Sequence, residues 1–333
     1  MIPPSSLKWQ QYQALLELLP EQHPTHPQIV EKFRITDIGE TSEDSLEFFL
    51  RQANVPSLTF IKRLRIEENI PFQIDWLVLA SSFRVLFEVK GHNGEIHFDA
   101  KANQLTRSKE GITESFTDPI LQVDRQYANL RTFLIDQQKE SLPTYRYAVF
   151  VNPRVILKLN DYPEFARVIT GQAVPFVLEK HSQKHPPIDP KVSNQHLAAL
   201  LIQHHHEKLS PILEKHHILW EDLKKGIPCP RCQNRAMIRE RMRWQCIKCE
   251  HRSTDAHIPV LYALALLTQN RLTSKLVQDF LQLESLEATR KLIKRAGYIK
   301  FGVKKAVYYA HPELLTITKS KSGHKSIESG HKV

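Results

Sequence analysis

The stretch PFQIDWLVLASSFRVLFEVKG, residues 71–91, decides the fold of this chain. Two apolar runs rich in β-branched and aromatic residues flank a short serine-containing turn, which predicts two adjacent strands. Because side chains alternate along a strand, we expect Glu88 and Lys90 on one face. The opposite face is expected to enter a core, with Val85, Phe87 and Val89. The first run is apolar on both faces, as in a buried central strand, at Ile74, Trp76, Leu77, Val78 and Leu79.

Asp75, Glu88 and Lys90 are the most informative polar residues of this stretch. Carboxylate oxygens suit a hard cation such as Mg²⁺, and a lysine suits an anionic oxygen. A carboxylate in a buried strand is costly unless a metal or another cation compensates its charge. The simpler alternative is that these are charges at a sheet edge, which block aggregation. The apolar neighbours of Asp75 favour a site over an edge.

The runs IDWLVL, FEVK and GHNGEI together resemble the nuclease-related (NERD) domain, a branch of the restriction-endonuclease-like PD-(D/E)xK superfamily. That family reads Ile-Asp-His, then Glu-x-Lys, then a glycine-containing turn. Upstream, GETSEDSLEFFL is similar to the family's Gly-Glu-x-Gly-Glu helix start and places Glu43 at the second glutamate. Downstream, DPILQ is similar to Asn-Pro-x-x-Gln and places Gln122. The resemblance covers about residues 36–155. Trp76 stands where the family usually has His, and Asp118 where it has Asn.

The resemblance implies an α/β restriction-endonuclease-like core, a mixed sheet flanked by helices, that hydrolyses DNA phosphodiester bonds. It also implies that Asp75 and Glu88 bind Mg²⁺ or Mn²⁺ with the Val89 carbonyl. Such a metal generates hydroxide and stabilises charge on phosphorus. Lys90 would orient the water or steady the phosphoryl oxygens. Glu43 and Gln122 would support the site.

Two of these assignments stay open when the residues alone are considered. Glu43 falls in the first turn of a helix expected at 42–53, where a carboxylate also complements the helix dipole. Gln122 belongs to a helix expected at 119–135, with Asp118 as N-cap and Pro119 at the first position. It lies beside the apolar stripe of that helix and could reach Lys90 or a phosphate, or simply face solvent.

Four cysteines form the strongest motif of the chain: Cys229, Cys232, Cys246 and Cys249. They make two Cys-x-x-Cys knuckles separated by thirteen residues, a spacing typical of one tetrahedral zinc of the ribbon type. All four ligand positions are cysteines, so no position stays open for a substrate and the zinc is expected to be structural. A disulfide framework would need an oxidising compartment.

The segment between the knuckles is rich in arginine. On a hairpin, Arg239, Arg241 and Arg243 are expected to share one face that sits on a phosphate backbone, with Trp244 packing or stacking nearby. The alternative is a solvated basic hairpin with a core tryptophan.

Residues 255–317 resemble a winged helix-turn-helix: three short helices and a basic hairpin. The expected third helix, LEATRKLIKRAGY, is capped by Ser285 and ended by Gly297. Its apolar side is expected to carry Ala288, Leu292, Ile293 and Ala296, and Thr289 lies on the other side. DNA-contacting residues are expected on this helix and on the wing, at Arg290, Lys291, Lys294, Arg295, Lys304 and Lys305. The alternative is a winged helix that binds protein.

Composition sets the broad class. The 333 residues carry a net charge of +10 and are 41% hydrophobic, which favours several folded domains and a polyanionic partner. The chain has no run of 18 apolar residues and its N-terminus lacks an apolar signal core, so we expect no membrane association and a cytoplasmic location. A helicase or another DNA-processing protein is a candidate partner. The rival functions are a non-catalytic DNA-binding regulator on a nuclease scaffold and an RNA nuclease.

The expected organisation has six segments. They are an N-terminal helical extension (1–35), a nuclease domain (36–185), a helical linker (186–226) whose histidines at 204–206, 216 and 217 face solvent, a zinc ribbon (227–254), a winged helix (255–317) and a disordered tail (318–333).

Overall fold

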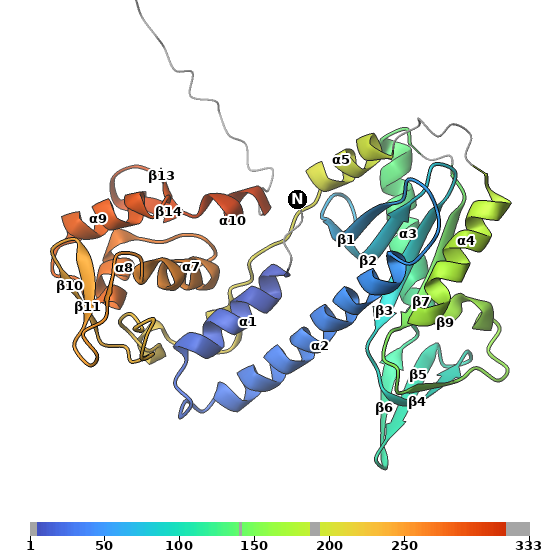
Figure 1. Ribbon diagram of the computed structural model, residues 1–333, viewed down its shortest axis with the longest axis horizontal. Coiled ribbons are helices and arrows are strands. Elements are labelled where there is room, and N and C mark those ends of the chain that lie inside the picture. Colours follow the sequence, from blue (N-terminus) through green and yellow to red (C-terminus); the bar gives the residue numbers. More distant parts are fainter. Residues whose placement is uncertain (1–4, 140–141, 187–193, 318–333) are drawn as a thin grey trace, which may run out of the picture. The chain divides into compact units, whose positions relative to one another are not determined.

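The computed structural model describes residues 5–139, 142–186 and 194–317 (Figure 1). The chain divides into two compact units. Unit 1 comprises residues 1–205 and 212–224, and unit 2 comprises residues 206–211 and 225–333, within the described ranges. None of the described helices combines the length and the apolar character needed to cross a bilayer. The tail expected after residue 317 lies outside the described residues.

Two helices open unit 1: α1 (Leu7–Leu18) and α2 (His26–Leu50). α1 confirms the helix expected near the N-terminus. The helix expected at 42–53 is wrong in its start, because α2 begins 16 positions earlier and crosses residue 35 without a break. Contacts with α1 stabilise this first half: Trp9 packs on Phe33 and donates its Nε1–H to Asp37 at 2.8 Å. Glu43 therefore does not lie in a first helical turn.

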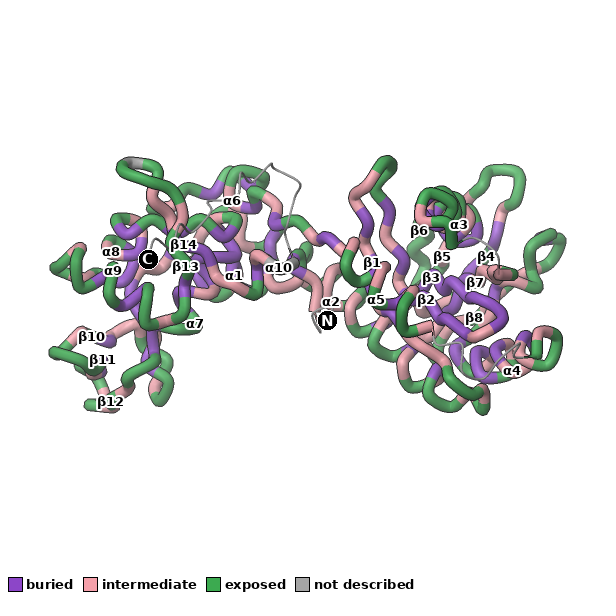
Figure 2. The backbone as a smooth tube through the Cα atoms, turned by 90° about the horizontal axis from the view of Figure 1, so that it is seen from above, coloured by how far each residue is buried: buried purple, intermediate pink, exposed green. Residues whose placement is uncertain are grey.

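A five-stranded mixed sheet forms the centre of unit 1, in the order β1-β2-β3-β7-β9. The first three strands are antiparallel, and β3, β7 and β9 run parallel. β2 and β3 are interior and buried on both faces (Figure 2), as the sequence predicts. The strands are β1 (Thr59–Ile66), β2 (Phe72–Leu79), β3 (Arg84–Lys90), β7 (Thr144–Phe150) and β9 (Val168–Thr170).

Helices cover both faces of this sheet. α3 (Pro119–Asp136) and α5 (Gln195–Gln203) share one hydrophobic core with the sheet, and α2 and α4 (Val174–Lys184) share the other. α3 begins as predicted, since the Asp118 side chain accepts from Ile120 N at 2.8 Å and Pro119 opens the first turn. Its predicted stripe faces the sheet at Val123, Tyr127, Leu130 and Leu134.

A second, four-stranded sheet lies in unit 1, in the order β6-β5-β4-β8. Its strands are β4 (Gly94–Asp99), β5 (Gln104–Lys109), β6 (Ile112–Thr117) and β8 (Val155–Lys158). No sequence pattern named above predicts the first three. β8 pairs with β4 here, whereas β7 pairs with β3 in the central sheet. Short helical turns η1 (Phe165–Arg167) and η2 (Gly171–Ala173) complete this region.

The segment expected as a helical linker is mostly not helical. α5 belongs to the core of the central sheet through Ala198 and Leu201, and only α6 (Ile212–Lys215) and η3 (Trp220–Asp222) follow. Two of the histidines expected at the surface are buried. His216 is 6% exposed and hydrogen-bonds the Tyr12 hydroxyl at 3.1 Å, and His206 is 9% exposed. Residues 187–193 lie outside the described ranges, and the six-segment division stays a prediction.

Unit 2 combines a cysteine-rich ribbon with a winged helix. The ribbon is a three-stranded antiparallel sheet of β10 (Met237–Glu240), β11 (Arg243–Cys246) and β12 (Arg252–Ser253). The winged helix consists of α7 (His257–Leu267), α8 (Ser274–Leu281), α9 (Leu286–Arg295), β13 (Ile299–Phe301), η4 (Lys304–Ala306), β14 (Tyr308–Ala310) and the added α10 (Pro312–Ile317).

The ends of these helices follow the sequence prediction. Thr273 and Ser285 cap α8 and α9 by accepting from backbone N–H groups, and Gly297 ends α9 with φ +85°. The predicted sides of α9 need one correction. Thr289 is fully buried and Ala288 is exposed, because the helix turns its 289–292–293 face into the winged-helix core.

Candidate active site and zinc site

The candidate site begins where the pairing of β2 with β3 ends. The ladder stops at Trp76 opposite Phe87, so Asp75 and Glu88 would have been the next opposed pair. Instead, the Val89 N–H donates to the Asp75 carboxylate, with Val89 N and Asp75 Oδ2 2.9 Å apart. A side chain thus takes the place of a backbone acceptor, and the two strands diverge at this point.

The faces of β2 switch at the same place. Ile74 and Leu77 lie in the core on the α3 side, whereas Trp76 lies in the core on the α2 side. Strict alternation would put Ile74 and Trp76 on one face. The neighbouring strand β1 makes the matching change at Arg63, whose φ of +52° is in the left-handed region. Asp75 therefore sits between the two faces of the sheet rather than on one of them.

Glu88 and Lys90 point to the α3 side, as the sequence predicts. Lys90 Nζ lies 2.6 Å from Glu88 Oε1 and 3.1 Å from Gln122 Oε1. The other Glu88 oxygen accepts from Gln126 Nε2 at 2.7 Å. Glu88 is only 2% exposed, and this network holds both of its oxygens. Sequence reasoning missed Gln126, although it lies one helical turn after Gln122 on the same face of α3.

Glu43 approaches the site from the α2 side. Its main-chain carbonyl accepts from Trp76 Nε1 at 2.8 Å, so this tryptophan anchors α2 to β2. Gly91 permits this close approach, because a Cβ there would lie 1.9 Å from Ser42 Oγ. Arg63, 5% exposed, pairs with Glu40 and lies 3.9 Å from Glu43 Oε2. No pattern in the sequence indicated Arg63.

The electrostatics of the site favour a bound cation. Burial and the negative charges of Glu88 and Glu43 raise the pKa of Asp75 well above its usual range. The hydrogen bond from the Val89 N–H lowers this pKa, but by less than the other effects raise it. Burial raises the pKa of Glu43 to about 7, with Arg63 opposing the rise. Two buried oxygens have no hydrogen-bond partner, Glu43 Oε2 and Gln126 Oε1. Asp75 and Glu88 therefore fit a divalent cation.

Glu43 does not complete a carboxylate triad. Within the described part of the chain, the four cysteines are the sole cluster of three or more metal-type ligand atoms lying within 4.8 Å of one another. The geometry thus brings together Asp75, Glu88, Lys90 and Gln122, and leaves Glu43 as a nearby charge behind Asp75.

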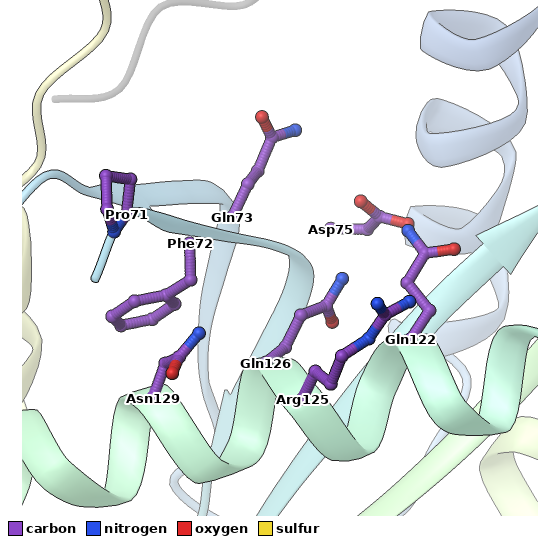
Figure 3. Close-up of a pocket in the computed structure, with 8 residues that line it drawn as sticks. All are labelled: Pro71, Phe72, Gln73, Asp75, Gln122, Arg125, Gln126 and Asn129. Atoms are coloured by element: carbon purple, nitrogen blue, oxygen red, sulfur yellow. The ribbon is translucent and has the colours of Figure 1, made fainter.

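A cleft of about 450 Å³ opens beside Asp75 (Figure 3). Gln122, Arg125 and Gln126 extend into it from α3, and Asp75 faces them from β2. The far end is lined by Pro71, Phe72, Gln73 and Asn129. Polar amides and a guanidinium beside a carboxylate pair suit a polar, anionic chain more than an apolar ligand.

A mixed sheet between helices, with Asp, Glu and Lys at a strand divergence, defines a nuclease-like α/β core. Residues 38–157 match the family model described as the nuclease-related domain, and the chain therefore carries such a domain. The matched range contains Glu43, Asp75, Glu88, Lys90 and Gln122. No curated protein and no solved structure was found to match the chain.

The four cysteines of unit 2 converge as the spacing predicts. Their sulfur atoms all lie within 4.8 Å of one another, and the Cys229–Cys249 and Cys232–Cys246 Sγ pairs are 3.6 Å apart. Tetrahedral zinc with Zn–S bonds of about 2.3 Å places sulfur atoms about 3.8 Å apart. The cluster could therefore hold one zinc ion, with no position left for a substrate.

The two knuckles have the same backbone. Gln233 N donates to Cys229 O and Glu250 N donates to Cys246 O, each at 2.9 Å. Gln233 and Glu250, each directly after the second cysteine, have φ of +60° and +61°. The repeated turn explains why two residues separate the cysteines, since it aims both sulfurs of a knuckle at one point.

The arginine hairpin differs from the prediction. Arg239 lies opposite Trp244 and Glu240 lies opposite Arg243, because the chain reverses at Arg241 and Met242. Opposed residues share a face, so the expectation that Arg239, Arg241 and Arg243 share one face is wrong. Trp244 packs rather than stacks on a base: it is 1% exposed, with the Arg239 guanidinium 4.9 Å from its ring centre.

The basic residues of the winged helix are placed on α9 and the wing. Arg290, Lys291, Lys294 and Arg295 are all exposed, and Lys291 pairs with Glu287 at 2.7 Å. Lys304 is exposed at the tip of the wing, and the side chain of Lys305 lies outside what the structure describes. Their roles in binding nucleic acid stay predictions.

The raised pKa of Glu43 predicts a pH-dependent stability. A carboxyl group whose folded pKa is raised destabilises the ionised folded protein, so stability falls as pH rises from about 4.5 to about 7. Glu43→Gln mimics the protonated form. We expect its urea-unfolding free energy to match the wild type below pH 4.5 and to exceed it by roughly 2 kcal/mol above pH 7.

The measurement uses protein without added divalent cation other than zinc. Glu47→Gln, an exposed carboxylate of the same helix that pairs with Arg51, is the control and should show only a small difference. The assigned pKa would be contradicted if the unfolding free energy of Glu43→Gln, relative to that of the wild type, stays constant or decreases as pH rises.

The cysteine cluster predicts about one zinc per chain, which elemental analysis measures directly. Cys246→Ser should lose the metal and expose residues 227–254 to protease, because metal binding and folding are coupled in such small sites. His251→Ala is the control, since His251 contacts Cys246 through its backbone carbonyl, which the substitution keeps, and it should retain zinc. A zinc-free wild type that resists protease would disprove the assignment.

Proposed function

We propose that this protein is a metal-dependent nuclease that hydrolyses DNA phosphodiester bonds. One observation carries the proposal: Asp75, Glu88 and Lys90 meet where β2 and β3 diverge, beside a polar cleft. Lys90 compensates the charge of Glu88, but the buried Asp75 carboxylate accepts from a backbone N–H and is repelled by Glu88 and Glu43, a cost that a bound cation would offset. The match to the nuclease-related domain supports the same reaction class.

Asp75 and Glu88, with the Val89 carbonyl, are the proposed ligands of Mg²⁺ or Mn²⁺. When bound, the metal would lower the pKa of a water molecule and stabilise charge on the phosphoryl oxygens. Binding would also neutralise the carboxylates, whose mutual repulsion contributes to the raised pKa of Asp75. Gln126 keeps the Glu88 carboxylate oriented through its 2.7 Å bond.

Lys90 is the proposed contact to the reacting phosphate or to the attacking water. In the free protein its ammonium group is held by Glu88 and by Gln122, a residue that lines the cleft. A cation bound to Glu88 would weaken that ion pair and free a donor for an anionic oxygen. Gln122 then serves to keep Lys90 in place, and Glu43 tunes the charge of Asp75.

The cleft supplies a path for the nucleic-acid strand. Arg125 is exposed at its rim and is suited to a backbone phosphate, and Gln73 and Asn129 add neutral donors further along. We assign most of the affinity to unit 2, through the zinc ribbon and winged helix, in agreement with the net charge of +10. A role in DNA processing in the cytoplasm is the biological setting we propose.

The cleavage test uses the purified full chain with labelled single- and double-stranded DNA and RNA, each with Mg²⁺, Mn²⁺ or no added metal. We expect metal-dependent cleavage of DNA. Glu88→Gln and Lys90→Ala should each lower its rate by on the order of 10²–10³-fold or more, since each removes a group needed at the reacting phosphate.

Glu95 and Lys158 provide a matched control pair. They form an exposed carboxylate–ammonium contact at 3.2 Å between β4 and β8, and neither belongs to the site. Glu95→Gln and Lys158→Ala should leave cleavage near the wild-type rate. Normal cleavage by Glu88→Gln, or no cleavage with any metal, would refute the enzyme and favour a binding protein on a nuclease scaffold. If the protein cleaves only RNA, the proposed substrate changes from DNA to RNA.

A further inference from the structure

A groove of about 610 Å³ lies within unit 2, between the tip of the ribbon hairpin and one side of α9. Its volume is in the range of small-ligand pockets. Five cationic side chains line it: Arg239, Arg241 and Arg243 from the hairpin, and Lys291 and Arg295 from α9. No carboxylate lines it. The positive charge of this groove favours binding of an anion.

The guanidinium of Arg239 is the clearest sign of a missing partner. Its Nη1 is buried and has no hydrogen-bond partner, and its face is occupied by the Trp244 ring. Burial and then the charge of Arg295 lower the pKa of Arg239. Two like charges are therefore held close together in a partly buried place, where a bound phosphate would satisfy the free N–H groups.

Apolar side chains also line the groove, and this set is called its apolar floor below. It consists of Met242, Ile258, Leu283, Ala288, Leu292 and Ala296. His257 lies at the wall and is neutral near pH 7, since burial lowers its pKa to about 4. Trp244 Nε1–H donates to its Nδ1 at 3.1 Å, so the neutral ring carries its proton on Nε2 and can donate to a ligand.

We propose that this groove binds an unpaired nucleotide, with the base on the apolar floor and the flanking phosphates on Arg239, Lys291 and Arg295. An apolar floor suits the face of a base, which a duplex keeps stacked and inaccessible. A duplex offers only its phosphates to such a groove. The inference rests on the proposed nuclease function and narrows its substrate to nucleic acid with single-stranded segments.

Only two of the four basic residues expected to contact DNA on α9 line the groove. Ala288, Lys291, Arg295 and Ala296 line the groove, whereas Arg290 and Lys294 do not. A recognition helix in a major groove would use exposed residues of the second kind. Each side carries one lysine and one arginine, with Lys291 also paired to Glu287, and the two sides therefore provide a comparison matched in residue type.

The test measures binding of a fluorescein-labelled single strand of about 12 nucleotides, and of the same sequence as a duplex, by polarisation near 0.1 M salt. All proteins are full-length, zinc-loaded and carry Glu88→Gln, so that binding is read without cleavage. We compare Lys291→Gln/Arg295→Gln with Arg290→Gln/Lys294→Gln. A third variant, Ala288→Trp, fills the groove without changing its charge.

We expect the single strand to bind more tightly than the duplex. Lys291→Gln/Arg295→Gln should weaken single-strand binding by about 10- to 30-fold and lower the salt slope by about 1.4, whereas Arg290→Gln/Lys294→Gln should change it less than about threefold. Ala288→Trp should weaken it at least about fivefold with the salt slope unchanged. Zinc content and thermal melting confirm that each variant is folded.

Three results would overturn the groove assignment: equal or tighter duplex binding, an equal or larger effect of the Arg290/Lys294 variant, or wild-type affinity in Ala288→Trp. Each leaves the cleavage test of unit 1 unaffected, because that test depends on Glu88 and Lys90. Conversely, if the protein binds single strands through this groove but cuts no substrate, the groove assignment stands and the proposed nuclease activity is refuted.

Discussion

The hydrogen bond from the Val89 N–H to the Asp75 carboxylate is the interaction on which the candidate site depends. It replaces a backbone acceptor with a side chain and so ends the β2–β3 ladder after Trp76. A continued ladder would carry Asp75 and Glu88 as an opposed pair in a closed sheet. The early ending leaves an opening beside α3: Asp75 lines the cleft there, and Glu88 is buried against Gln126 of α3.

The surrounding residues then act on that opening from both sides. From α3, Gln126 and Gln122 hold Glu88 and Lys90 through hydrogen bonds. From α2, the Glu43 carbonyl accepts from Trp76, and Gly91 allows the helix to approach the end of β3. Arg63 offsets part of the negative charge behind Asp75. The arrangement holds several carboxylates close together, and this repulsion is what a divalent cation would relieve.

The parts predictable from sequence were those set by local rules. Alternation placed Glu88 and Lys90 together, capping residues placed the starts of α3, α8 and α9, and Cys-x-x-Cys spacing placed the sulfur cluster. The resemblance to the nuclease-related domain was also confirmed, over residues 38–157. These features depend on residues close together in the chain.

The missed parts depend on contacts between distant residues or on broken periodicity. The start of α2 depends on packing against α1, which no pattern within 26–41 reveals. The face of the hairpin on which Arg243 lies depends on the tight turn at Arg241 and Met242. This turn interrupts the alternation of side chains between the two faces. Arg63 and Gln126 act through residues elsewhere in the chain, and the groove beside α9 needs the ribbon packed against that helix.

The most direct test of this account is a crystal of the zinc-loaded protein soaked in Mn²⁺, with anomalous difference maps recorded for manganese. The account predicts one manganese peak within bonding distance of Asp75 and Glu88, lost in Glu88→Gln, and an ammonium group of Lys90 that has moved away from Glu88. A map with no peak beside these carboxylates at saturating Mn²⁺, or a peak that persists in Glu88→Gln, would contradict it.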